Sequence, residues 1–342
     1  MPGAAKNTPT WSITIDGQAI GEDASGLLPR ALRCEIGMDG VGACTIALIV
    51  PDGAGLPAPG GVLQVELGFD GSNEPAFAGE IDEVRATVAG VTLGAGDALA
   101  RLANSFGSGV FVDQAAAKIV RDVLDMGGAT AGTLDDGPAL AQYVLYPGLS
   151  LLHHLQVLAE LTGSALFADP QGKVHFLAPD TAGKRHSFSL RGDVLAVDLV
   201  RAPTSRGGVD VWGEGAGGTQ GASKSHWLPT SLSGVTGSAG LPGPAPYGSP
   251  AAARQLFVRD GSVRTGDAAS ALAKARAGAL DRPFRGSLEV SGAPAVAPND
   301  RVGLTDCTLG HLESLLDGAE LRVRRVRHRL DLERGFTTRM EF

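Results

Sequence analysis

Aromatic residues, cysteines and long apolar runs are all scarce in this chain. Aromatics make up 5% of the 342 residues, against 49 glycines and 20 prolines, and this balance favours turns and short strands over a helical bundle. No stretch approaches the roughly 18 apolar residues of a membrane-spanning helix, so we expect no membrane insertion. Residues 1–11 lack a basic region followed by an apolar one, which predicts synthesis in the cytoplasm without a signal peptide.

The three cysteines, Cys34, Cys44 and Cys307, are far apart in the sequence and form no CxxC motif. Their odd number and spacing predict buried, reduced thiols. The same spacing is wrong for a structural zinc site, so we expect no metal.

The charge balance also excludes a class of partner. The net charge is −8 and the isoelectric point is near 5.4, whereas nucleic-acid-binding surfaces are usually basic, so we expect no nucleic-acid partner. Hydrophobic residues make up 43% of the chain, enough for a substantial core. The length predicts about two or three domains.

Residues 1–106 read as a first β-barrel-like domain. Short alternating apolar segments are separated by Asp16-Gly17, by a second Asp-Gly and by Pro51-Asp52-Gly53, which are turn signals. Residues 75–97 read as strand, tight turn and strand, closing at Asp97.

Residues 107–184 predict an α/β domain. Asp113 is the expected N-cap of a helix that ends at Gly127-Gly128. A second helix is expected from Ser150 to Gly163, followed by a hairpin that turns at residues 169–172.

Residues 185–342 predict a second β-barrel-like domain. It contains a Gly-, Pro- and Ser-rich segment, 213–250, interpreted as a long loop, and an Ala-rich helix over 267–281. Residues 62–97 and 300–342 share an order of elements, a strand, an excursion and a long hairpin, which suggests an internal repeat. The expected fold is mainly β, with two similar small β-barrel-like domains flanking an α/β domain.

No catalytic or cofactor motif stands out. Residues 213–218 fit GxGxxG, but no helix follows to receive a pyrophosphate, so we interpret them as a loop. His153 and His154 are adjacent on a helix and face different directions, which excludes a zinc pair. We therefore expect no catalytic, cofactor-binding or metal-binding residues and no cofactor.

Acidic pairs and one basic run are the remaining charge features. Asp82 and Glu83 are strand neighbours that face opposite sides, and Asp135-Asp136-Gly137 reads as a turn. Arg325, Arg327 and Arg329 fall on one strand face. This face is either solvated or, alternatively, contacts an acidic partner or a neighbouring subunit.

The ordered set of these elements resembles the baseplate hub family of contractile tails. That family includes phage baseplate hubs, the late-control protein D of phages, the N-terminal part of VgrG and the hubs of extracellular contractile injection systems. The matching positions are a strand-and-hairpin set and a helix-and-hairpin set: Phe77, Gly79, Ile81, Asp97, Ser150, Leu151, Leu155, Leu158, Gly163 and Gly172.

The resemblance implies a structural, non-enzymatic homotrimer whose two β-domains per chain form a ring of pseudo-sixfold symmetry. Such a ring joins a hexameric inner tube to a trimeric spike, and its partners are tube, spike and other baseplate proteins of a tail or virion-like particle. A VgrG chain would continue into a needle, whereas this chain ends at Phe342, so we expect a separate spike polypeptide.

Two other functions remain open at this point. A cell-wall glycan hydrolase would require a cleft with two carboxylates roughly 5–10 Å apart. A glycan-binding or adhesion module usually displays exposed aromatics, and the chain has only three Trp and three Tyr.

Overall fold

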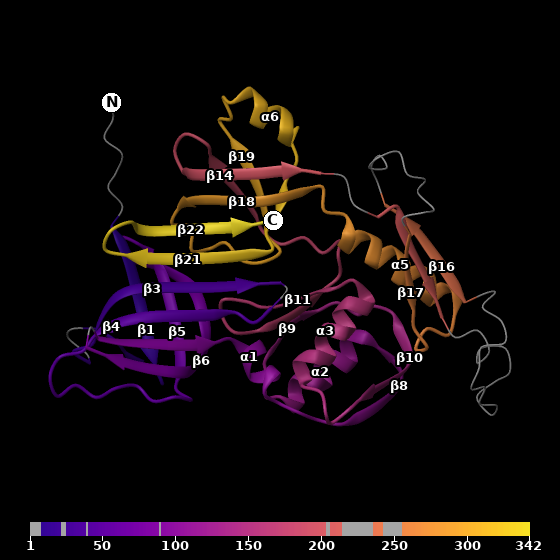
Figure 1. Ribbon diagram of the computed structural model, residues 1–342, viewed down its shortest axis with the longest axis horizontal. Helices are drawn as coiled ribbons and strands as arrows, with labels where there is room; N and C mark the ends of the chain where they lie inside the picture. Colours follow the sequence, from indigo (N-terminus) through magenta and orange to yellow (C-terminus); the bar gives the residue numbers. More distant parts are fainter. Residues whose placement is uncertain are drawn as a thin grey trace.

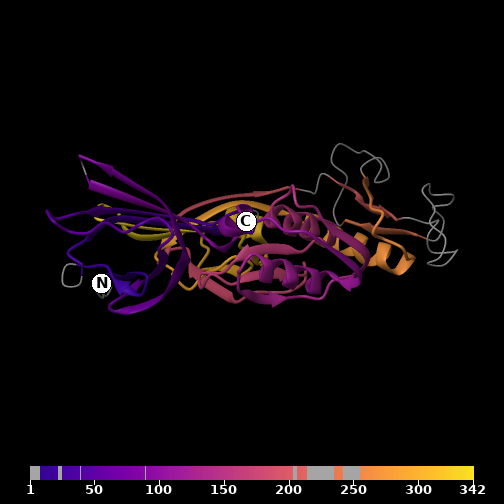
Figure 2. The ribbon, with the colours of Figure 1, turned by 90° about the horizontal axis from the view of Figure 1, so that it is seen from below.

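The computed structural model describes residues 8–21, 25–38, 40–88, 90–202, 206–213, 235–241 and 255–342. The molecule is elongated, with the N-terminal strands at one end, three helices in the middle and a small sheet with an Ala-rich helix at the other end (Figures 1 and 2). Within the described residues, no helix has both the length and the apolar character needed to cross a bilayer.

The first seven strands build two facing layers around a hydrophobic core. Leu63, Val65 and Leu67 alternate with exposed residues and are fully buried, as the alternating sequence predicts. Asp16 and Gly17 both have positive φ and form the predicted first hairpin turn. The strands are β1 (Pro9–Ile15), β2 (Gln18–Ala19), β3 (Leu28–Gly37), β4 (Ala43–Ile49), β5 (Val62–Phe69), β6 (Ser72–Thr87) and β7 (Gly90–Gly96).

Strand β6 connects the two layers. Its first part, up to Glu80, pairs with β5, and its second part, from Glu80 to Thr87, pairs with β7. The register shifts between Ile81 and Glu83, and such a bulge bends a strand and increases its twist. The sheet therefore turns a corner at β6, and the core is enclosed between β3-β4-β7 and β1-β5.

The C-terminal strands repeat this plan with local differences. The strand β13 pairs with β19 in parallel, whereas β1 and β5 in the first half are antiparallel. A short helix, α6 (Gly310–Leu316), lies between β19 and β20 and was not predicted. The elements are β13 (Arg185–Ser189), β14 (Val194–Arg201), β18 (Phe284–Ser291), β19 (Arg301–Thr305), β20 (Leu321–Arg322), β21 (Arg325–Asp331) and β22 (Gly335–Glu341).

Both halves contribute to one sheet of eleven strands. Its order begins β14-β18-β22-β21 and continues β3-β4-β7-β6. In each set, the two strands that come first in the chain are followed by the two strands of a hairpin, so the two sets have the same arrangement. The junction is the antiparallel pair β21 and β3, in which Arg327 lies opposite Glu35. Figure 1 shows this stacking from β14 to β4. The two halves are thus joined head to tail.

The middle of the chain forms a helical unit with small sheets. Ser150 caps the third helix by accepting a hydrogen bond from the backbone N–H of His153, and Gly163 ends it in the left-handed conformation, as predicted. Asp97 caps the first helix. The elements are α1 (Ala98–Ala103), β8 (Gly109–Ala115), α2 (Ala116–Met126), β9 (Ala131–Leu134), β10 (Ala139–Leu145), α3 (Leu151–Thr162), β11 (Ala165–Ala168) and β12 (Val174–Leu177).

A later segment packs onto this unit rather than onto the C-terminal strands. It comprises β15 (Gly208–Trp212), β16 (Thr236–Gly240), β17 (Gln255–Arg259) and α5 (Gly266–Leu280). Val209 and Val211 on β15 share a hydrophobic cluster with α2 and α3, as do Ala269 and Leu272 on α5. The described residues of 208–280 therefore pack with the helices. The domain limits of 107–184 and 185–342 stay a prediction from the sequence.

Two expectations from the sequence are wrong. Asp113 does not cap α2, because it lies inside β8 with φ at 51°, and the cap position is Ala115, without a side-chain hydrogen bond. The segment 213–250 is not a continuous loop, since Thr236–Gly240 forms β16 and pairs with β15. Glycine and serine in β16 gave no strand signal, but Gly237 is needed there because a Cβ would lie 2.3 Å from the backbone carbon of Ala269. Residues 214–234 and 242–250 lie outside the described residues.

Candidate functional site

The sequence candidates do not converge on one reaction centre. His154 is buried, with Nδ1 3.2 Å from the hydroxyl of Tyr143 and Nε2 3.2 Å from the backbone nitrogen of Tyr146, whereas His153 is exposed. Among the described residues, no group of three or more His, Cys, Asp or Glu side chains is placed to hold a metal ion. Gly213 precedes residues outside the described part of the chain, so the GxGxxG interpretation stays a prediction.

One acid of each pair has a structural partner. Asp135 accepts hydrogen bonds from the backbone N–H of Ala178 at 2.7 Å and from the hydroxyl of Thr181 at 2.5 Å. Glu83 is ion-paired with Arg85 at 2.7 Å. These carboxylates hold local structure and are not directed at a common cavity.

Among the described acids, Asp97 has the pKa that burial shifts the most. Burial raises its pKa to about 6, against the opposing effect of hydrogen bonds from the backbone N–H groups of Gly42, Ala100 and Leu99. It lines two small cavities together with Glu80, one of which Asp82 also lines, and Glu80 is ion-paired with Arg101. Both carboxylates are thus engaged with helix α1, Asp97 as its cap and Glu80 through a side chain of the same helix.

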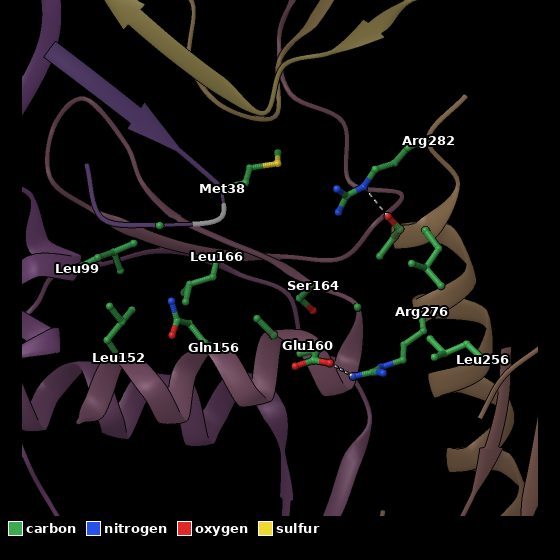
Figure 3. A pocket seen from close by; sticks show the side chains of 15 residues that line it. Met38, Leu99, Leu152, Gln156, Glu160, Ser164, Leu166, Leu256, Arg276 and Arg282 are labelled. Atoms are coloured by element: carbon green, nitrogen blue, oxygen red, sulfur yellow. Dashed lines mark hydrogen bonds and ion pairs between the residues drawn. The ribbon is translucent and has the colours of Figure 1, made fainter. Parts of the chain in front are cut away.

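A larger cavity, of about 400 Å³, lies between α3, β11, the end of β3 and α5 (Figure 3). Its walls are mainly aliphatic, and the one carboxylate among its described lining residues, Glu160 on α3, is 3.4 Å from Nη2 of Arg276 on α5. Arg276 also donates from Nε to the carbonyl of Leu161 at 3.4 Å. The described lining residues therefore do not include the second carboxylate that a glycan hydrolase needs, and the ion pair joins two helices. Its apolar side chains are Met38, Leu99, Leu152, Leu166, Leu256 and Leu280.

The arginine run is paired within the chain. Glu35 on β3 contacts Arg327 at 2.8 Å, Arg325 at 3.2 Å and Arg33 at 3.0 Å. Partial burial acts to raise the pKa of Glu35, but hydrogen bonds from Arg327 and Arg33 and the nearby positive charges lower it overall. Arg329 contacts Asp331 at 2.6 Å. These arginines therefore have acidic partners within the chain, and the ion pairs of Arg325 and Arg327 with Glu35 join the two halves of the sheet.

Two of the open strand edges in the described part of the chain belong to the repeated strand order. Strand β14 pairs with β18 on one side and with no described strand on the other. Its exposed apolar residues are Leu195 and Val200, 59% and 54% exposed. The second part of β6, from Asp82 to Thr87, pairs with β7 alone. Open edges carry unpaired backbone groups that can accept another strand.

These edges occupy equivalent positions in the repeated sheet order. Strand β14 starts the set β14-β18-β22-β21 as β3 starts the set β3-β4-β7-β6, and β6 ends its set as β21 does. Inside the chain, the equivalent edges β21 and β3 pair with each other. The sequence did not indicate these edges, because they are defined by strand order and by no local motif.

The complete chain is similar to solved structures of tail proteins. The 43 kDa tail protein of prophage MuSo2 from Shewanella oneidensis aligns with a TM-score of 0.67 at 16% identity, over 98% of both chains. A tail protein from Neisseria meningitidis MC58 aligns with a TM-score of 0.64 at 14% identity, over 98% of this chain and 96% of the other. The chain has the fold of phage tail proteins.

The likeness extends to a secretion component. The E. coli c3393 protein, a component of the type VI secretion system described as structurally similar to the T4 bacteriophage tail proteins gp27 and gp5, aligns with a TM-score of 0.59. Identity is 12%, over 96% of this chain and 75% of the other. No protein-family model matches the chain, and no curated protein matches it in sequence. The mainly β fold expected from the sequence is confirmed.

Proposed function

We propose that this protein is a non-enzymatic structural component of a phage or contractile tail, namely a trimeric hub that adapts a hexameric inner tube to a trimeric spike. The observation that supports it best is the repeated sheet order. Two similar sets of strands, joined head to tail through β21 and β3, leave an open β14 at one end and an open β6 edge at the other.

The same pairing between copies would build a ring. In such a ring, β14 of one copy pairs with the second part of β6 in the next, as β3 pairs with β21 within the chain. Head-to-tail interfaces close into rings when the rotation allows it. Two sets per chain and three chains give six similar positions, which matches a hexameric tube on one face while the ring keeps the threefold symmetry of a spike.

The first experiment measures the mass of the purified protein by light scattering, alone and mixed with candidate spike and tube proteins. The expected result is a species of three times the 34.8 kDa chain. Val200→Lys places a charge on the open edge of β14, at a side chain already 54% exposed within one copy. We expect this variant to fold and to stay monomeric.

Leu332→Lys is the matched control. Leu332 is 87% exposed in the turn between β21 and β22, away from both open edges, so this variant should form trimers as the wild type does. A monomer in every mixture, or trimers of Val200→Lys as stable as those of the wild type, would contradict the proposed ring.

A further inference from the structure

A second cavity, of about 330 Å³, lies where the end of α5 meets β19, β20 and the last residue of the chain. It is lined by the arginines Arg282, Arg301, Arg322 and Arg324 and by two acids, Asp281 and Glu320. Arg282 and Arg324 have interaction partners of their own, so the chemistry of the cavity is decided by Arg322 and Arg301.

Arg322 is fixed in place but incompletely satisfied. Its Nε donates to Oδ1 of Asn299 at 2.8 Å, and its Nη1 donates to the carbonyl of Pro179 at 3.1 Å. The remaining nitrogen, Nη2, is buried and has no hydrogen-bond partner among the described residues. A buried charged donor without an acceptor is strongly unfavourable, so this position calls for an acceptor.

Arg301 adds a second cation to the same cavity. Its side chain forms no hydrogen bond or ion pair with the described residues. Burial first, and then the charges of Arg301, Arg324 and Arg282, together lower the pKa of Arg322 to about 10. The local field is therefore positive.

The two acids of the cavity do not neutralise this pair. Glu320 is 3.4 Å from Arg185, outside the cavity. Burial raises the pKa of Asp281, which is the opposite of the effect that a paired arginine would have. No hydrogen bond or ion pair thus joins Arg322 or Arg301 to an acidic side chain among the described residues that line the cavity.

We propose that this cavity binds a phosphate-class oxyanion between Arg322 and Arg301. Guanidinium groups present planar sets of N–H donors that match the oxygens of phosphate, and two cations balance a divalent anion. The bound anion would bridge the neighbouring strands β19 and β20, in which Arg301 and Arg322 are register partners, beside the end of α5.

The test titrates inorganic phosphate into the full chain by calorimetry and follows the thermal unfolding midpoint in parallel. Sodium chloride and acetate at equal ionic strength serve as references. We expect one phosphate per chain and a saturable rise of the midpoint, because a ligand that binds only the folded state stabilises it.

Arg301→Gln is the informative variant, since the side chain of Arg301 forms no hydrogen bond or ion pair with another described residue. It should lower phosphate affinity on the order of tenfold or more, as expected for loss of a charged hydrogen bond. Arg285→Gln, an exposed position on β18, should bind phosphate as the wild type does. The proposal is overturned if phosphate acts no more than chloride, if acetate matches phosphate, or if Arg301→Gln binds with wild-type affinity.

Discussion

Oδ2 of Asp97 accepts a hydrogen bond from the backbone N–H of Gly42 at 2.8 Å, although 55 residues separate the two along the chain. Its other oxygen, Oδ1, accepts from the backbone N–H groups of Leu99 and Ala100 at 2.9 and 3.2 Å. A Cβ on residue 42 would lie 2.5 Å from Oδ2, so the contact also requires glycine there. One buried carboxylate thereby ties the start of β4 to the start of α1.

Replacing Asp97 should weaken this junction. Asp97→Ala leaves three backbone N–H groups without their acceptor, and we expect the free energy of unfolding to fall by about 2 kcal/mol, as for other lost caps and buried hydrogen bonds. Urea unfolding at pH 7 measures this loss. Asp52→Ala, at an exposed turn position, is the control, and an equal loss in both variants would show that Asp97 is not a special contact.

The pH dependence of stability should contain two opposing contributions. Burial lowers the pKa of His328 to about 4 from an ordinary 6.5, so its contribution is present above pH 6.5 and is lost as the pH falls through 4. Burial raises the pKa of Asp97 to about 6 from 3.8, so its contribution is present below pH 3.8 and is lost as the pH rises through 6. Each amounts to roughly 3 kcal/mol.

Single variants should separate these two effects. Between pH 7 and 4.5, Asp97→Asn should lose more stability than the wild type, because only the histidine contribution remains. His328→Gln should lose less, or gain. Urea unfolding of the three proteins at both pH values provides the comparison, and parallel pH profiles would contradict the assignment of these pKa shifts.

Gly163 should be intolerant of a side chain for two reasons. Its φ is 69°, and a Cβ would lie 2.5 Å from the carbonyl oxygen of Ala275 on α5. Gly163→Ala should therefore lower the free energy of unfolding by roughly 2 kcal/mol or more, from backbone strain and overlap together. Gly148→Ala, where a Cβ would meet nothing within 4 Å, should change it little. Equal midpoints in chemical denaturation would show that α5 shifts freely away from α3.

The three cysteines should differ in reactivity. Cys34 and Cys44 face each other on β3 and β4 with their sulfur atoms 2.9 Å apart, each 1% exposed, whereas Cys307 is partly exposed. Burial and the neighbouring thiol raise the pKa of Cys34, which disfavours the reactive thiolate. We expect iodoacetamide to modify Cys307 alone in the folded protein and all three after denaturation, as read by mass spectrometry. Rapid native labelling of Cys34 would contradict the packing of β3 against β4.

Local signals in the sequence were read correctly where the structure itself is local. Ser150 and Gly163 bound their helix because a cap and a left-handed glycine act within one turn. The alternation in β5 matches its burial because one face of that strand meets the core. Asp97 was correctly seen to end the β6–β7 hairpin, but its contact with Gly42 depends on chain segments that come together only in the fold.

Features that depend on residues far apart in the chain could not be predicted from the sequence. Asp113 has the residue type of an N-cap, but β10 pairs with its segment and makes it a strand. All three cysteines were predicted to be buried, whereas Cys307 is partly exposed, and the buried Cys34 and Cys44 are direct cross-strand neighbours. The arginine residues on β21 did not indicate that Glu35 is their partner, because Glu35 lies almost at the other end of the chain. The cavity that contains Arg322 likewise gathers residues from five separate segments.

The pairing of β21 with β3 also limits when these two strands can fold together during synthesis. Arg327 and its partner Glu35 are 292 residues apart, so at typical translation rates β3 waits roughly 15 to 60 s for its neighbour to leave the ribosome. During that interval the edge of β3 is open to strands of other nascent chains. Misassembly during synthesis should therefore concentrate at β3, and any agent that shields this edge until the final hairpin emerges would raise the yield of correctly folded protein.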